Sequence, residues 1–153
     1  MELKDDLTQL KNIQDLLEDS RKGYLEAAAN ADNRIVKEML IGLGASRVKL
    51  LGEVLTLSRK ADPGKEPREG GTLKGDLHRA WMDIREALGT NETTAMLNEC
   101  ERGEEFLLDR YDAVVEKDVA PETFALATVQ RAVIQENLAH VKEVRKTLER
   151  IEH

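Results

Sequence analysis

The chain has 153 residues with 23 basic and 30 acidic side chains, which gives a formal net charge of −7. This length suits a single domain over residues 1–153, and the acidic charge disfavours nucleic acid as a partner because phosphates repel it. No apolar run approaches the roughly 18 residues of a membrane-spanning helix, and the first residues show no apolar signal-peptide centre. Cys100 is the only cysteine, which excludes an internal disulfide and leads us to expect a cytoplasmic protein.

Four long helices are predicted, because apolar residues recur at steps of three and four in four stretches of the chain. These stretches cover about residues 3–29, 34–59, 92–118 and 122–151. Asn30, Asp32 and Asn33, between the first two stretches, are of the types that end and cap helices. Pro121 disfavours helix at the residue before it and so separates the last two. The fold class is therefore all-α.

A long connection joins the second and third of these helices. Residues 60–72 contain two prolines and three glycines, which indicates a loop. Residues 73–88 have an apolar period of their own and predict a short helix, and Thr90 or Asn91 is expected to cap the helix that follows. Such a connection is long enough to return along a whole helix, which favours a ferritin-like four-helix bundle over a simple up-down-up-down bundle.

Carboxylates and an imidazole near the apolar stripes suggest a metal site. Di-iron bundles take one Glu from each of two helices and a Glu-x-x-His from each of the other two. Glu101 and Glu104 are three residues apart, and Glu136 and His140 are four apart, so the members of each pair share a helix face. The remaining candidate ligands, on the first two helices, are Glu18 and Glu53.

The same residues also have structural interpretations. A helix rich in Glu is typical of a solvated face with interhelical salt bridges. His140 lies on the apolar stripe that we predict for its helix, where a hydrogen-bonded core histidine is more common than a ligand. Cys100 is interpreted as a buried apolar residue, because four neighbouring Glu side chains would raise its pKa and oppose a reactive thiolate.

Arg47 falls inside the apolar stripe of the second helix, which contains no histidine. A buried arginine needs a carboxylate partner, since a lone charge in a core is very costly. Pairing with Glu101 or Glu104 would take up carboxylates that a metal needs. The sequence therefore predicts a structural polar core of Arg47, Glu101 and Glu104, with no cofactor.

Several segments of the chain carry a family resemblance. They are LLEDSRKGYLEAA, SRVKLLGEV, GDLHRAWMDIREAL, LNECERGEEFLLDRYDAVV and QENLAHVKEVRKTL. Over about residues 5–150 the chain resembles bacterial ferritin-like four-helix-bundle proteins of unknown function, which are related to rubrerythrin-like proteins.

The resemblance implies a cytoplasmic ferritin-like bundle, and some members of the wider superfamily bind two irons and handle oxygen or peroxide. Carried over to this chain, it implies Glu101 or Glu104 together with His140 as ligands, and Glu18 or Glu26 with Glu53 as their companions. The chain departs from the pattern because its second helix lacks a Glu-x-x-His.

Two functions follow as hypotheses. The first is a non-catalytic bundle, a stress-linked accessory protein that acts by association and forms a homodimer, with no nucleic acid or membrane partner. The second is a metal-binding ferritin-like protein with iron or manganese and an oxidation or iron-handling activity. A small-ligand pocket between helices is a third alternative.

Overall fold

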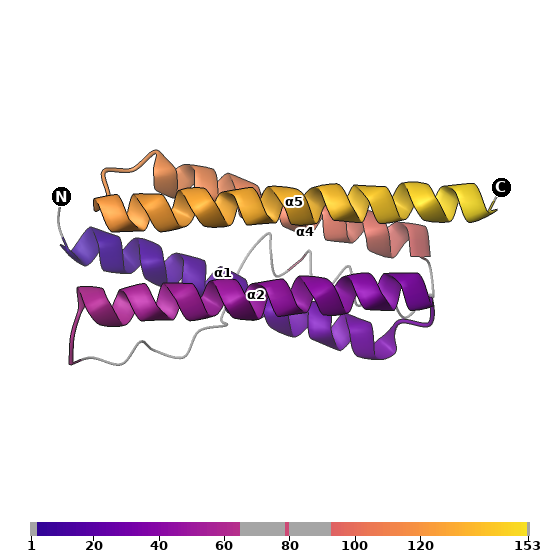
Figure 1. Ribbon diagram of the computed structural model, residues 1–153, viewed down its shortest axis with the longest axis horizontal. Coiled ribbons are helices and arrows are strands. Elements are labelled where there is room, and N and C mark those ends of the chain that lie inside the picture. The colour runs from indigo at the N-terminus through magenta and orange to yellow at the C-terminus, as the bar shows by residue number, and fades with distance from the viewer. Residues whose placement is uncertain (1–2, 65–78, 80–92, 153) are drawn as a thin grey trace.

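The computed structural model describes residues 3–64, 79 and 93–152, and these residues form four long helices (Figure 1). The helices are α1 (Leu3–Asn30), α2 (Arg34–Ala61), α4 (Thr93–Val115) and α5 (Pro121–Glu152). The all-α class and the four helices are confirmed, and the predicted bounds differ from the observed ones by at most three residues. The short helix expected within residues 73–88, apart from Arg79, and the cap expected at Thr90 or Asn91 lie outside the described residues.

The helices pack as two antiparallel pairs, α1 with α2 and α4 with α5 (Figure 1). The pairs meet where α2 contacts α5 and where α1 contacts α4. In Figure 1, α2 ends at the same end of the bundle as the N-terminus, whereas α4 begins at the opposite end. The helices α2 and α4 therefore run in the same direction. None of the described helices is both long and apolar enough to cross a membrane.

Local signals explain where the helices begin. The Asn33 side chain accepts a hydrogen bond from the Val36 backbone N–H at 3.1 Å and so caps α2. Pro121 opens α5, at a position where a missing N–H leaves no helical hydrogen bond unmade. The backbone N–H of Ala120 donates to Asp6 Oδ1 at 2.8 Å, which ties α1 to the turn before α5.

The buried face of α5 differs from the predicted one. The apolar period of residues 122–151 predicts a stripe that includes Val129, His140 and Ile151. In the structure Val129 and Ile151 are 63% and 67% exposed, and His140 is exposed as well. The prediction that His140 lies on the apolar stripe is therefore wrong. The face that enters the core is offset by one residue and consists of Thr123, Ala127, Gln130, Ile134, Val141, Val144 and Leu148.

Two glycines of α2 offer a matched test of helix packing. A Cβ on Gly52 would meet nothing within 4 Å, whereas a Cβ on Gly44 would lie 2.7 Å from Leu25 Cδ2. Gly52→Ala should raise the free energy of unfolding by about 0.5–1 kcal/mol, because alanine loses less backbone entropy in a helix. Gly44→Ala should give a smaller gain or a loss, because Leu25 must move. Urea denaturation measures both, and an equal gain at the two positions would contradict this packing.

Candidate functional site

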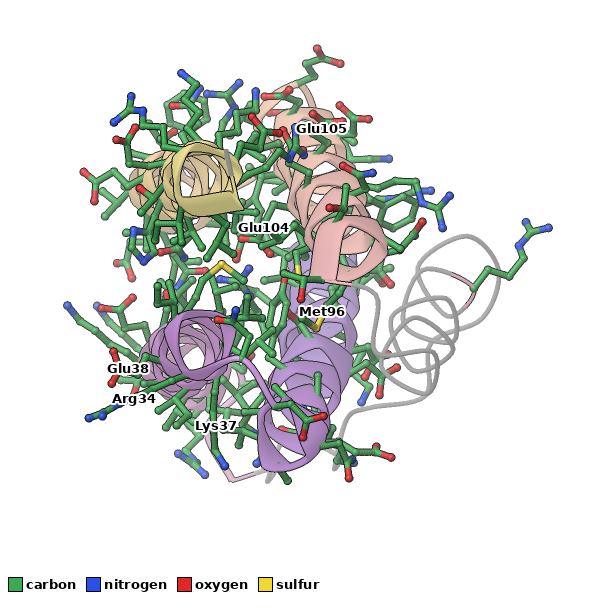
Figure 2. The ribbon with its side chains drawn as sticks, turned by 90° about the vertical axis from the view of Figure 1, so that its right-hand side faces the viewer. Arg34, Lys37, Glu38, Met96, Glu104 and Glu105 are labelled. Atoms are coloured by element: carbon green, nitrogen blue, oxygen red, sulfur yellow. The ribbon has the colours of Figure 1, made fainter. Side chains whose placement is uncertain are left out.

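A charged pair lies at the centre of the bundle. Arg47 of α2 and Glu104 of α4 are both 0% exposed. Arg47 Nη2 donates to both carboxylate oxygens of Glu104. Figure 2 shows Glu104 on the inward side of α4 and its neighbour Glu105 on the outward side. The pair therefore links α2 to α4 through the core.

Two residues of α1 extend this pair. Arg47 Nε donates to Ser20 Oγ at 2.8 Å, and the Tyr24 hydroxyl donates to Glu104 Oε2 at 2.5 Å. The guanidinium carbon of Arg47 lies 5.5 Å from the centroid of the Tyr24 ring, within range of a cation–π contact. Only Nη1 of this guanidinium is buried without a hydrogen-bond partner among the described residues. We call Ser20, Tyr24, Arg47 and Glu104 the arginine network.

A second polar layer lies beside the arginine network. The Tyr111 hydroxyl of α4 donates to Gln130 Oε1 of α5 at 2.7 Å. Gln130 Nε2 donates in turn to the Leu50 carbonyl at 3.0 Å and to Glu53 Oε1 at 3.1 Å, both on α2. The arginine network joins α1, α2 and α4, and this glutamine layer joins α2, α4 and α5. Together the two layers connect all four described helices.

Burial keeps the interior groups in defined protonation states. Burial raises the pKa of the Tyr24 hydroxyl well above its usual value, and the charge of Glu104 raises it further. Burial also raises the pKa of the Cys100 thiol, and Glu104 and Glu99 add to this effect, as predicted for a non-reactive cysteine. Burial disfavours the charged form of Arg47, but the charge and hydrogen bonds of Glu104, together with Tyr24 and Tyr111, outweigh this effect and the Arg47 pKa is raised. The arginine network therefore contains a guanidinium cation that holds its proton.

The six carboxylate and imidazole residues proposed as metal ligands do not form one cluster. Glu104 binds Arg47, and Glu101 forms an interhelical salt bridge with Arg145 of α5. Their companions are engaged or exposed: Glu18 pairs with Arg21, Glu53 accepts from Gln130, and Glu26, Glu136 and His140 are exposed.

The described residues bring no metal-binding cluster together. Within 3–64, 79 and 93–152, no three His, Cys, Asp or Glu side chains come close enough to one another to hold a metal ion. Two of the interior carboxylates already neutralise arginines. These residues do not fit a di-metal centre.

Sequence reasoning missed four members of the interior. Tyr24 and Tyr111 follow the apolar period of their helices, which gives no sign of a polar role, and the pattern does not single out Ser20 or Gln130. A signal for Gln130 exists in the seven-residue repeat of Ala127, Ile134, Val141 and Leu148, which places Gln130 on the same face of α5. No comparable signal marks Ser20.

The geometry defines a class of protein, an all-α four-helix bundle with an ion pair and two tyrosines in its core. A family model described as a domain of unknown function, DUF2383, matches residues 5–117. The chain therefore belongs to the DUF2383 family. No curated protein matches the chain significantly.

The arginine network predicts a specific pattern of stability. Arg47→Met should lower the free energy of unfolding by about 3–5 kcal/mol, because Glu104 stays buried without its counter-charge. The double variant Arg47→Met, Glu104→Leu should recover most of that loss, since apolar residues can replace a buried ion pair at little cost. Urea denaturation of the single and double variants measures this coupling.

The control is Arg21→Met, which removes the partly exposed pair with Glu18 and should cost less than about 1 kcal/mol. An Arg47→Met loss as small as that of the control would show that the buried pair does not stabilise the fold in this way.

Alkaline pH should destabilise the protein. The pKa of Tyr24 and of Tyr111 is raised by burial, so the native state holds these protons while the unfolded state releases them near pH 10. The stability present below pH 10 therefore falls above it, by up to about 1.4 kcal/mol per pH unit for each tyrosine. Urea denaturation between pH 8 and 11.5 measures the slope, which Tyr111→Phe should make shallower. An unchanged slope in that variant would rule out the contribution of Tyr111.

Proposed function

We propose that this protein is a non-catalytic ferritin-like bundle that acts by association with protein, and that the Arg47–Glu104 pair replaces a metal centre in its interior. The observation that carries the proposal is the complete burial of this pair between α2 and α4. The arrangement of two antiparallel helix pairs, in which α2 and α4 run in the same direction, supports the ferritin-like part of the proposal.

Electrostatics favours the guanidinium over a metal ion. A unit positive charge 4 Å from another is repelled by about 4 kcal/mol at an effective dielectric constant of 20, and a divalent ion is repelled twice as strongly. Arg47 holds its charge because Glu104 raises its pKa, so this repulsion persists at all physiological pH values. A divalent ion near Glu104 would have to displace the arginine from a carboxylate that it already neutralises.

The network is suited to a structural task. Its hydrogen bonds and those of the glutamine layer connect all four described helices at defined positions along each helix. A shift of one helix along its neighbour would leave a charge or hydroxyl buried without its partner, which is costly. We infer that the interior specifies helix register and presents the outer faces of the helices in a fixed arrangement.

Metal analysis tests this proposal. Protein produced with added iron or manganese and then titrated with Fe(II) should hold much less than one ion per chain, because the candidate ligands do not converge. Elemental analysis and the binding titre give the result.

One outcome would reverse the conclusion. Near-stoichiometric Fe(II) binding that is lost in His140→Ala and in Glu104→Gln would favour the metal-binding alternative. Glu105→Gln, at an exposed position next to Glu104, is the control and should leave any titre unchanged.

A further inference from the structure

The outward face of α2 has a small-residue centre with charged flanks. Gly42 and Ala45 are exposed in the N-terminal half of the helix. Arg34 and Glu38 are exposed on the N-terminal side, and Figure 2 shows both side chains projecting from α2 away from the other helices. Beyond the centre, Lys49 and Glu53 are exposed on the C-terminal side, and Glu53 also accepts the hydrogen bond from Gln130 through Oε1, which leaves Oε2 for a partner. We call these six residues the α2 outer face.

Packing within the described part of the chain does not account for the presence of glycine at position 42. A Cβ at Gly42 would meet nothing within 4 Å, unlike one at Gly44, which would touch Leu25. Glycine within a helix costs roughly 0.5–1 kcal/mol relative to alanine. The axes of two packed helices usually lie about 8–10 Å apart, and small residues at the contact allow distances at the short end of this range. Close approach by another molecule would give Gly42 a role.

The charges on the α2 outer face are arranged symmetrically about its centre. Arg34 and Glu53 lie equally far from the point midway between Leu43 and Gly44, and so do Glu38 and Lys49. Gly42 and Ala45 share the same midpoint. In each of the two charged pairs the signs are opposite. If a second α2 packed antiparallel about this point, each of the four charged residues of the α2 outer face would therefore lie opposite a residue of opposite charge.

We propose that the protein forms a two-fold symmetric dimer in which the α2 outer face packs antiparallel against the same face of a second copy. Glu38 lies opposite the partner's Lys49, and Arg34 lies opposite the partner's Glu53. A surface that is complementary to itself is the requirement of a two-fold interface. The dimer extends the proposed function, association with protein, by naming a second copy of this chain as the partner.

Exposed apolar side chains border the interface. Ile41 and Val48 lie on α2 beside the outer face and are 48% and 53% exposed. The dimer covers both, so apolar burial adds to the charge pairs. The intrachain Arg34–Glu38 pair, at 3.4 Å with both side chains mostly exposed, is weak and leaves both groups able to pair across the interface.

A charge exchange tests the geometry directly. Sedimentation equilibrium of the full chain should show a mass of two chains of 17.2 kDa each, with a dissociation constant that increases with salt. Glu38→Lys and Lys49→Glu should each raise this constant by about tenfold or more, because each creates two like-charge contacts per dimer. The variant with both changes should return close to the wild-type constant.

Only contact between two copies explains such a rescue. Within one helix, residues 38 and 49 are about 16 Å apart, so the exchanged charges do not meet in the same chain. The new repulsion between Arg34 and a lysine at position 38 also remains in the double variant, as a neighbour pair within α2. Restored dimerisation therefore reports the partner's charge.

Steric variants complete the test. Ala45→Arg should abolish the dimer, whereas Ala139→Arg, at an exposed position on α5, should not. Circular dichroism and thermal unfolding check that each variant is folded. A monomeric wild type at every concentration, a dimer that survives Ala45→Arg, or no rescue in the double charge variant would each overturn the dimer.

These results are independent of the proposed absence of a metal centre. A monomer without stoichiometric Fe(II) would overturn only the dimer, and a dimer with stoichiometric Fe(II) lost in His140→Ala would overturn only the non-catalytic assignment. Binding of α2 to a different protein by a monomeric chain would also count against the dimer.

Discussion

The constraint on which this structure depends is the cost of a buried arginine. Arg47 is fully enclosed between α1, α2 and α4. The free-energy cost of an unpaired charge at this position would exceed the stability of a typical small domain. Glu104 neutralises Arg47, and Ser20 accepts a further hydrogen bond from the guanidinium. Tyr24 donates a hydrogen bond to the Glu104 carboxylate. Each of these side chains comes from a particular turn of its helix. The requirement to solvate one cation therefore selects one relative placement of three helices.

The fourth helix joins through a neutral layer. Gln130 of α5 accepts from Tyr111 and donates to α2, so α5 is held by directional bonds without a second buried charge pair. At the border of the core, Glu101 and Asp112 of α4 pair with Arg145 and Arg131 of α5. These partly exposed pairs add little stability by themselves, but they disfavour a slipped α4–α5 register. The ion pair between α2 and α4 is therefore fully buried, whereas the ion pairs between α4 and α5 lie near the surface.

The sequence predicted helix positions well, because the period of apolar residues and the Asn33 cap are local signals. It predicted less well which polar residue faces inward. Glu101 and Glu104 are only about 60° apart around α4, so the stripe admits either as the partner of Arg47. The contact of Glu101 with Arg145 of α5 decides that Glu104 pairs with Arg47, and that contact depends on tertiary structure. On α5, Gln130 and Thr123 occupy core positions and interrupt the apolar stripe. The predicted buried face is therefore displaced by one residue, and His140 is wrongly included in it.

α2 connects the interior of the bundle to its surface. Arg47 points into the core, whereas Ala45 and Gly42 are exposed on the other side of the same helix. Because the arginine network fixes α2 both along and around its axis, the α2 outer face is presented without further ordering of its backbone. Preorganised surfaces lose less entropy on association. A polar core that contributes little net stability can therefore still matter for association, since a rotation of α2 would move the charges of that face out of register.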